Sequence, residues 1–239
     1  MNQWIKDVAW VSETKNPVRG VILAFHGLGA PAVREGPANA QELAYIAAGG
    51  LVVFPYYGPW SWMNRQARAF VDELVGTIYA EYTLADSVPL ISTGGSMGGC
   101  SALLYTRYAR KPVAACSASC PVCDVPYHVT ERVDLPRTFR NAFYGYEEPF
   151  ETVLQEHSPL AQASHMPDVP YLVVHGDADT AVNKEKHSDR FVAAMKAHKR
   201  RVEYVEVPGM GHGGPLPLAV IQKEIEFVVS HMKRCPRSD

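Results

Sequence analysis

The sequence around Ser96 is Leu90-Ile91-Ser92-Thr93-Gly94-Gly95-Ser96-Met97-Gly98-Gly99-Cys100, a short apolar run that ends in glycines. Residues 88–92 have the composition of a buried strand, and residues 99–110 have the periodicity of a helix. Ser96 therefore lies in the turn between them, where Gly94 and Gly98 let strand and helix pass closely because neither carries a Cβ. We predict that this turn presents Ser96 as a nucleophile at the carboxyl edge of a sheet. A purely structural turn is the alternative.

Two backbone N–H groups are expected to face the Ser96 hydroxyl. Met97 begins the predicted helix, so its N–H has no intrahelical acceptor and can donate to a developing oxyanion. The Leu28 N–H, in the glycine-rich loop that follows the apolar run at 18–25, is expected to be the second donor, although a plain strand-to-helix turn fits that loop equally well. His26 begins the loop, and we expect it to make structural hydrogen bonds.

Length and composition favour one globular domain over residues 1–239, with 47% hydrophobic and 20% charged residues. The net charge of −2 arises from interspersed charges, and the longest basic cluster is Lys199-Arg200-Arg201. This pattern argues against a nucleic-acid partner. No run approaches the roughly 20 apolar residues of a membrane span, and the first residues do not resemble a leader. We therefore expect a cytoplasmic protein without a membrane partner.

The five cysteines are an odd number, so pairing cannot use all of them. Reduced thiols are the default expectation. Cys120 and Cys123 have the spacing of a redox or metal motif, but no second Cys/His pair lies at zinc-finger distance. We expect packing thiols, with metal or redox use as the alternative.

The rest of the chain alternates between strand-like and helix-like runs. Two β-rich runs at 4–11 and 18–25 flank a polar turn and predict an opening hairpin. Further strands are expected at 51–55, 113–119, 171–175 and 202–207, and helices at 38–48, 66–82, 185–198 and 217–233.

An aromatic loop, Tyr56-Tyr57-Gly58-Pro59-Trp60-Ser61-Trp62, follows the strand at 51–55. Ligands bind at the carboxyl ends of strands in open α/β sheets. We therefore predict that Tyr57, Trp60 and Trp62 form a substrate wall, with ordinary packed surface as the alternative.

The segment at about 121–168 is broken by prolines into short pieces, with helical stretches at 138–144 and 149–156. A segment of about 50 residues without a strand, inserted between two strands, favours a cap over the site. We expect it to shape substrate preference more than the folding of the sheet. Its expected apolar lining is Tyr127, Phe139, Phe143, Tyr144 and Tyr146.

Three residue types needed for acyl transfer follow three strands in the order Ser96, Asp179, His212. A serine hydroxyl needs a histidine to take its proton, and a carboxylate must orient that histidine and stabilise its charged form. His212 is chosen because it lies in a glycine-rich loop directly after a strand, unlike the other histidines. The order Ser, acid, His is that of the α/β-hydrolase arrangement.

The chain resembles the catalytic domain of the prolyl-oligopeptidase family and its free-standing esterase and dienelactone-hydrolase-like relatives. The motifs that carry this resemblance extend from Val18 onward and are Gly94-Gly95-Ser96-Met97-Gly98-Gly99, Ser158-Pro159-Leu160, His175-Gly176-Asp177-Ala178-Asp179 with Val182, and Gly211-His212-Gly213. The resemblance implies an α/β-hydrolase fold with a mostly parallel sheet, flanking helices and a short helical cap between two late strands. It implies Asp179, the last residue of H-G-x-x-D, as the acid, with Asp177 as the alternative. The multidomain peptidases carry a β-propeller before this domain, for which the chain has no room.

The sequence therefore predicts a serine hydrolase that cleaves small-molecule carboxylic esters through Ser96, His212 and Asp179, without cofactor or metal. An aminopeptidase or acylaminoacyl-type peptidase is the first alternative. The adjacent carboxylates Glu147 and Glu148 could anchor an amine, although a solvated turn is the preferred interpretation. A non-catalytic binding protein of the same fold is the second alternative, against which the complete triad argues. The oligomeric state and the acyl and alcohol groups stay open.

Overall fold

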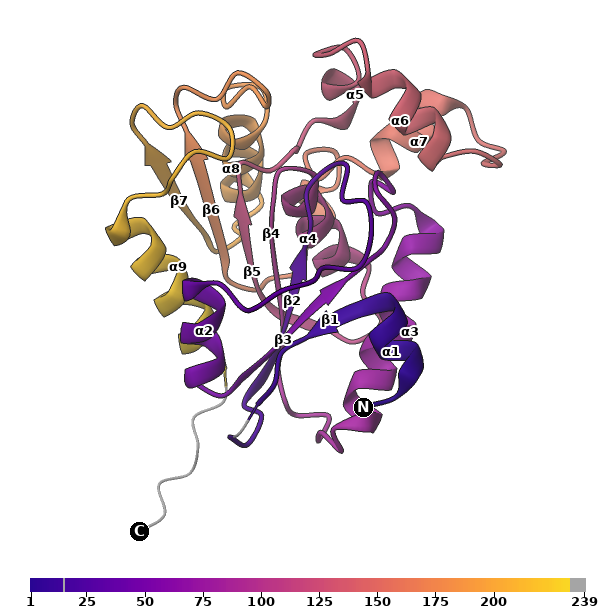
Figure 1. The fold of residues 1–239 in the computed structure, drawn as a ribbon. Helices are drawn as coiled ribbons and strands as arrows, with labels where there is room; N and C mark the ends of the chain where they lie inside the picture. Colours follow the sequence, from indigo (N-terminus) through magenta and orange to yellow (C-terminus); the bar gives the residue numbers. More distant parts are fainter. Residues whose placement is uncertain (15, 233–239) are drawn as a thin grey trace.

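The computed structural model describes residues 1–14 and 16–232. Within them, one seven-stranded sheet runs through the centre of the molecule in the order β1-β3-β2-β4-β5-β6-β7 (Figure 1). All neighbouring strands are parallel except β1, which pairs antiparallel with β3. The strands are β1 Ala9–Val11, β2 Gly20–Phe25, β3 Gly50–Pro55, β4 Leu90–Gly95, β5 Val113–Ser119, β6 Tyr171–Gly176 and β7 Val202–Val207. The prediction of a mostly parallel sheet is confirmed.

Helices cover both faces of this sheet (Figure 1). The described helices are α1 Gln3–Val8, α2 Ala40–Ala47, α3 Arg65–Glu81, α4 Met97–Tyr108, α5 Val125–His128, α6 Leu135–Ala142, α7 Phe150–Glu156, the 3-10 turn η1 Ala163–His165, α8 Ser188–Ala197 and α9 Leu218–Ser230. The expected helix at 185–198 begins only at Ser188, because turns occupy the residues before it. Lys233, the expected end of the last helix, lies outside the described residues.

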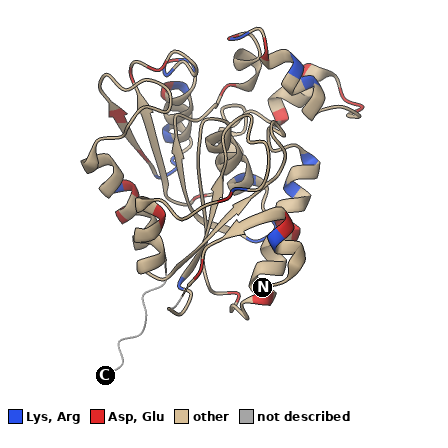
Figure 2. Ribbon diagram, in the orientation of Figure 1, with Lys and Arg blue, Asp and Glu red and all other residues tan. Residues whose placement is uncertain are grey.

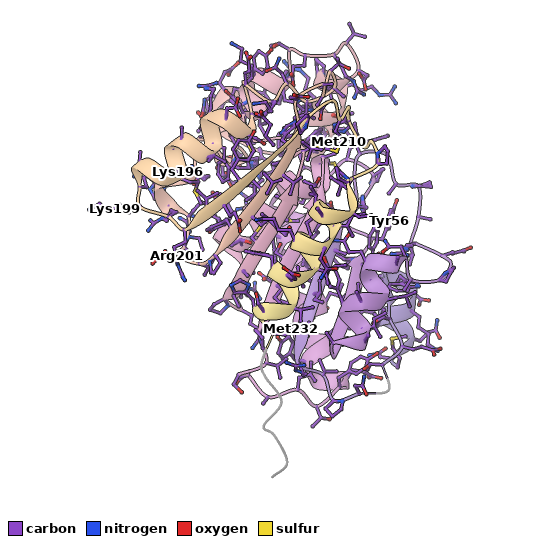
Figure 3. The ribbon with its side chains drawn as sticks, turned by 90° about the vertical axis from the view of Figure 1, so that its left-hand side faces the viewer. Tyr56, Lys196, Lys199, Arg201, Met210 and Met232 are labelled. Carbon is purple, nitrogen blue, oxygen red and sulfur yellow. The ribbon has the colours of Figure 1, made fainter. Side chains whose placement is uncertain are left out.

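Successive side chains of each strand point to opposite faces of the sheet, so the sheet packs between two layers of helices. On β2, Val21 and Leu23 pack into the cluster that also contains the buried residues of α3, α4 and α8. Ile22 points to the opposite face, where it packs with Tyr45 of α2 and Val228 of α9. Figure 3 shows α9 crossing in front of the sheet, with Met232 beyond its end. Both faces of the central strands are thus buried, which explains why these strands are nearly continuous apolar runs.

The predicted opening hairpin is wrong. The first half of that run forms α1, and only residues 9–11 form a strand, which pairs with β3 in the register Ala9↔Pro55. Most of β2 is buried, and its two sheet neighbours are the parallel strands β3 and β4. No edge of β2 is left for β1, so the short β1 takes the edge position beside β3.

Four short helical elements, α5, α6, α7 and η1, separate β5 from β6 in the predicted cap region. In Figure 1, α5 to α7 lie beyond the carboxyl ends of the strands. Phe139 of α6 is fully buried and stacks on Trp62, with ring centroids 4.0 Å apart. Phe143 is also buried and packs on His157. The Phe139 ring therefore joins the cap to the body, whereas the ring contacts of Phe143 lie within the cap; neither ring lines the described pocket.

Lysines and arginines alternate with acidic residues over the outer elements (Figure 2). The basic cluster at 199–201 lies at the turn between α8 and β7 (Figure 3). That turn precedes β7, so it is at the opposite end of the parallel sheet from Ser96. None of the described helices is long and apolar enough to cross a membrane.

Candidate active site

Ser96 occupies a strained turn between β4 and α4. Its backbone angles are φ 57° and ψ −125°, a region that residues with a Cβ rarely adopt. A Cβ on Gly94 would lie 2.4 Å from the Gly98 carbonyl oxygen, and one on Gly98 would lie 2.2 Å from that of Phe25. Both glycines are therefore required for the close approach of β4, α4 and β2, as the sequence predicts.

The structure brings Ser96, His212 and Asp179 into one hydrogen-bonded chain. His212 Nε2 is 2.9 Å from Ser96 Oγ, and His212 Nδ1 is 2.7 Å from Asp179 Oδ2. A carboxylate only accepts hydrogen bonds, so Nδ1 carries the ring hydrogen and Nε2 accepts from the serine hydroxyl. The His212 side chain is 27% exposed, whereas the Asp179 side chain is fully buried. The His212 ring is thus partly open to solvent, and the Asp179 carboxylate is shielded from it.

All acceptor positions of the Asp179 carboxylate are used. Oδ1 accepts from the N–H groups of Ala181 and Val182, each at 2.9 Å. Oδ2 accepts from His212 and lies 3.2 Å from His175 Nε2. Burial alone would raise the pKa of this carboxyl, but the hydrogen bonds from His175, His212 and Val182 outweigh burial and hold the pKa well below its usual range. Asp179 is therefore a carboxylate at neutral pH.

His175 was expected to be structural, and it supports the acid directly. Its ring is fully buried, with Nε2 3.1 Å from the Val182 carbonyl and Nδ1 2.6 Å from Ser188 Oγ. Because a carbonyl only accepts, Nε2 carries the hydrogen that also faces Asp179. The first residue of the H-G-x-x-D motif thus helps to orient the last, a contact that residue spacing did not reveal.

Asp177, the alternative acid, points to another element. Its Oδ1 accepts a 2.6 Å hydrogen bond from the Gly209 N–H, in the loop that leads from β7 to His212. It therefore caps that loop, while Asp179 alone of the two carboxylates contacts the His212 ring.

The two expected oxyanion donors flank Ser96. Met97 is the first residue of α4, so its N–H has no intrahelical acceptor. Gly27, next to Leu28, lies beside Ser96, since a Cβ placed on it would be 4.0 Å from Ser96 Cβ. Within residues 1–14 and 16–232, the Leu28 N–H has no hydrogen-bond partner. Both groups are thus available to a ligand at Ser96.

His26 is buried beside this loop and stacks on Tyr57 with ring centroids 4.2 Å apart. Its Nδ1 donates to the Gly27 carbonyl at 2.9 Å. Burial lowers the pKa of the ring, so it is neutral at physiological pH. Among the described residues no hydrogen bond joins the His26 ring to Ser96, and the ring supports the loop, as the sequence suggests.

The three predicted wall aromatics have different surroundings. Trp62 is 1% exposed, and its Nε1 donates to Thr138 Oγ1 in the cap. It is therefore a packing residue, and the expectation that it forms part of a substrate wall is wrong. Tyr57 is also buried, and its hydroxyl donates to the His26 carbonyl at 2.8 Å. Trp60 is half-buried and its Nε1 donates to Asn141 Oδ1. Trp60 is therefore the aromatic of the three that a substrate can reach most directly.

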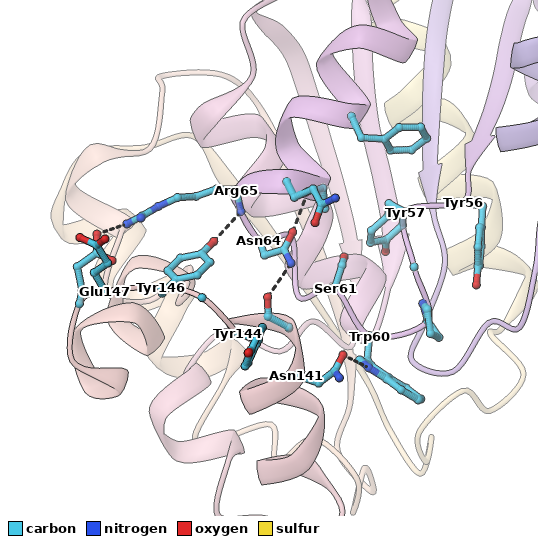
Figure 4. A pocket seen from close by; sticks show the side chains of 18 residues that line it. Tyr56, Tyr57, Trp60, Ser61, Asn64, Arg65, Asn141, Tyr144, Tyr146 and Glu147 are labelled. Atoms are coloured by element: carbon cyan, nitrogen blue, oxygen red, sulfur yellow. Dashed lines mark hydrogen bonds and ion pairs between the residues drawn. The ribbon is translucent and has the colours of Figure 1, made fainter.

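A pocket of about 1130 Å³ lies between the aromatic loop, the start of α3 and the cap (Figure 4). Asn64 Nδ2 donates to the Ala142 carbonyl, and the Arg65 N–H donates to the Tyr146 hydroxyl, both at 2.7 Å. The pocket adjoins the oxyanion loop, because the Gly29 N–H donates to the carbonyl of Pro59 in its wall. Of the expected cap lining, Tyr144 and Tyr146 do line this space.

Glu147 and Glu148 stand on the rim of the pocket. Glu148 forms an ion pair of 2.7 Å with Arg65, whose guanidinium also binds Glu156 of α7 at 2.5 Å. The hydrogen bond from Arg65 lowers the pKa of Glu148. Glu147 has no ion-pair partner among the described residues, so it is the carboxylate of the two that could face a cation.

Two side-chain clusters have the composition of metal sites, His128–Glu131–His187 and Cys120–Asp179–His212. In the first, His187 Nδ1 accepts from the N–H groups of Cys123 and Asp124. The ring hydrogen is therefore on Nε2, which donates to Glu131 Oε2 at 2.9 Å and offers no lone pair to a metal. This cluster is a hydrogen-bonded anchor between the cap and the residues before α8.

Four cysteines lie within the described residues, all buried and unpaired: Cys100, Cys116, Cys120 and Cys123. Burial raises the pKa of each thiol. The expectation of packing thiols holds for Cys100, Cys116 and Cys123, whereas the position of Cys120 beside His212 was missed. The position of Cys120 directly after β5 was the available signal, because the carboxyl end of β5 lies at the same edge of the sheet as Ser96.

The model of the prolyl oligopeptidase family matches residues 66–238 of the chain. No curated protein matches it. Among solved structures, a puromycin-hydrolysing peptidase of Mycobacterium tuberculosis gives a TM-score of 0.73 at 20% identity, covering 97% of this chain and 38% of that one. The acylaminoacyl peptidase of Pyrococcus horikoshii gives 0.77 at 13% identity, covering 97% and 40%. A truncated carbohydrate esterase from gut microbiota gives 0.70 at 17% identity, covering 93% and 89%.

The chain spans 38% and 40% of the length of the two peptidases. At these identities the likeness shows the fold, which is the α/β-hydrolase fold. Peptidases, an esterase and a lipase share it.

Proposed function

The chain belongs to the prolyl oligopeptidase family of serine hydrolases, and from that premise we propose that it cleaves small carboxylic esters through Ser96, His212 and Asp179. The observation that carries the proposal is the hydrogen-bonded chain from Ser96 Oγ through the His212 ring to Asp179 Oδ2, at 2.9 and 2.7 Å. These distances are within the range for a nucleophile and its base.

Acylation follows from this geometry. Ser96 Oγ attacks the acyl carbonyl while His212 Nε2 takes its proton, and Asp179 stabilises the resulting imidazolium. The N–H groups of Met97 and Leu28 donate to the oxyanion of the tetrahedral intermediate. His212 then gives the proton to the leaving alcohol, and an acyl-enzyme is formed.

Water completes the reaction by the same route. His212 takes a proton from the water as it attacks the acyl-enzyme, and the second tetrahedral intermediate collapses to the acid with Ser96 reprotonated. Each proton has a donor and an acceptor within this site, so the mechanism requires no further group.

Esters are favoured over peptides because an alkoxide or phenoxide leaves more readily than an amine. Efficient amide cleavage needs the leaving nitrogen held where His212 can protonate it. Trp60 and Tyr144 offer aromatic surface in the adjoining pocket, which suits an aryl or short acyl group. We propose residues 121–168 as the cap that contributes part of this surface.

A peptidase is the second candidate, because Glu147 lies on the pocket rim without an ion-pair partner among the described residues. It could hold the amino group of an aminoacyl substrate. Glu148 is less suited to that role, since Arg65 already neutralises it.

The deciding experiment compares kcat/KM for a p-nitrophenyl ester with that for the matching aminoacyl p-nitroanilide. We expect the ester to be preferred, and Glu147→Gln to leave the ester rate unchanged. If the anilide matches the ester, and Glu147→Gln but not Glu148→Gln abolishes that activity, the peptidase replaces the esterase.

A fluorophosphonate probe separates both enzymes from a binding protein that keeps the fold without the chemistry. We expect covalent labelling at Ser96 and none in Ser96→Ala. Absence of labelling in the unmodified protein would favour the binding protein.

A further inference from the structure

A cysteine thiol lies against the acid and the base of the proposed triad. Cys120 Sγ, a carboxylate oxygen of Asp179 and a ring nitrogen of His212 all lie within 4.8 Å of one another. The ester mechanism above uses no step at Cys120. A soft nucleophilic atom beside the acid–base pair therefore needs its own explanation.

The backbone holds this thiol in place. Cys120 follows β5 directly and has φ 43°, in the left-handed region that residues with a Cβ seldom adopt. Its N–H donates to the Val174 carbonyl at 2.7 Å, while the Ser96 N–H donates to the Ser119 carbonyl at 2.9 Å. Hydrogen bonds to both neighbouring strands thus fix Cys120 at the same sheet edge as Ser96.

The three side chains offer sulfur, nitrogen and oxygen, the ligand atoms that zinc takes in proteins. Three protein ligands leave a fourth position for water in a tetrahedral site. The exposed part of His212 provides a route for an ion. We propose that Cys120, Asp179 and His212 form a binding site for a soft divalent metal ion such as Zn²⁺, and that occupancy switches hydrolysis off.

The proton balance explains the loss of activity. The metal takes the place of the hydrogen between His212 Nδ1 and Asp179 Oδ2, and that hydrogen moves to Nε2. A protonated Nε2 can no longer accept the Ser96 proton, so the base is lost. The Cys120 thiol releases its own proton to solvent as the metal–sulfur bond forms. One proton therefore leaves per ion bound.

The effect on activity rests on the proposed function, but metal binding does not. The first measurement is therefore spectroscopic and uses Co²⁺ alone on the full chain carrying Cys235→Ser, which removes the cysteine outside the described residues. We expect a thiolate-to-cobalt charge-transfer band that Cys120→Ser abolishes. Cys123→Ser is the matched control, a buried thiol near the same strand end but outside the cluster, and should keep the band.

The second measurement is Zn²⁺ inhibition of p-nitrophenyl ester hydrolysis, reversed by a chelator. Each variant is compared with its own metal-free rate. Cys120→Ser should raise the half-inhibiting Zn²⁺ concentration by about tenfold or more, since even outer-shell changes cost about 10- to 100-fold in metal affinity. Cys120→Ala serves the same purpose if the serine variant fails to fold.

A band that persists in Cys120→Ser would overturn the site, whether or not the protein hydrolyses any ester. A band confined to Cys120-containing protein, together with equal Zn²⁺ inhibition of the parent and Cys120→Ser, would overturn the switch. A protein without hydrolase activity that still shows the Cys120-dependent band would support the site and contradict the proposed function.

Discussion

Ser96 shows how one residue can be placed at the expense of backbone strain. At φ 57° and ψ −125° its Cβ is in an unfavourable position, which the packing of β4 against α4 and the hydrogen bond from the Ser96 N–H to the Ser119 carbonyl maintain. Ser96→Gly should therefore be more stable than Ser96→Ala by about 1 kcal/mol, because relief of strain of 1–3 kcal/mol exceeds the entropic cost of glycine. Urea unfolding of the two inactive variants measures the difference. A less stable glycine variant would show that the turn is not strained.

The two carboxylates of the late loop should differ sharply in their effect on turnover. Asp179→Asn should lower kcat by about 10³- to 10⁴-fold, because an amide cannot compensate the imidazolium and can hold the wrong tautomer. Asp177→Asn should lose less than about tenfold, or 1.4 kcal/mol in activation free energy, since Asp177 only caps the Gly209 loop. Steady-state kinetics of both variants on the same ester shows which carboxylate matters more for kcat. Greater damage in the Asp177 variant would reverse the assignment of the acid.

The contact between helices α2 and α9 contains a buried carboxyl that makes stability depend on pH. Glu224 is 5% exposed, and burial raises its pKa to about 7, against a smaller lowering by the Gln41 hydrogen bond. The folded protein therefore keeps a proton that the unfolded chain releases above pH 4.5. The contribution of Glu224 to the free energy of unfolding should therefore fall as pH rises from about 4.5 to 7.

Glu224→Gln should remove this dependence and stabilise the protein at pH 8 by up to about 3 kcal/mol. Urea unfolding at pH 5 and pH 8 tests it. Glu226→Gln is the matched control, because Glu226 is exposed on the same helix. The interpretation fails if both substitutions shift stability equally.

Helix α6 contributes one fully buried aromatic ring to its contact with the body, beside hydrogen bonds from Trp60, Trp62 and Asn64. Phe139 is fully buried and stacks on Trp62, whereas Tyr144, just beyond the helix, is 90% exposed. Phe139→Ala should cost about 3–5 kcal/mol, the usual range for a buried phenylalanine. Tyr144→Ala should leave the thermal midpoint unchanged. Similar losses in both variants would mean that α6 does not depend on the stacked pair.

At the scale of the molecule, the cap and the sheet share one core. Leu135, Phe139, Val153 and Leu154 belong to the same buried cluster as the residues of β2 and β4. The expectation that the cap affects substrate preference more than the folding of the sheet stays a prediction, and deletion is a poor test of it, because loss of the cap would expose Trp62 and its neighbours. Substrate preference has to be tested by point substitutions at the pocket.

Trp60 is the suitable position, since it lines the pocket and is half-buried. Trp60→Ala should lower kcat/KM for an ester of an aromatic acid about tenfold more than for the acetate ester of the same alcohol. This difference corresponds to about 1.4 kcal/mol of selective binding. Tyr56→Ala, in the same wall, serves for comparison. Equal losses across the ester series would contradict a role of this pocket in selectivity.

The sequence by itself determined the strand, the glycine-flanked serine turn and the order Ser96, Asp179, His212, because these depend on local periodicity and on steric limits between neighbouring residues. It also determined most strand positions, since strands buried on both faces are recognisable as apolar runs. Tertiary structure alone decided that β1 pairs with β3, that Trp62 is buried under the cap, that Cys120 lies within 4.8 Å of Asp179, and that His175 contacts the same carboxylate. Those outcomes depend on which distant elements compete for the same edge, face or hydrogen bond, and residue spacing along one chain contains no record of that competition.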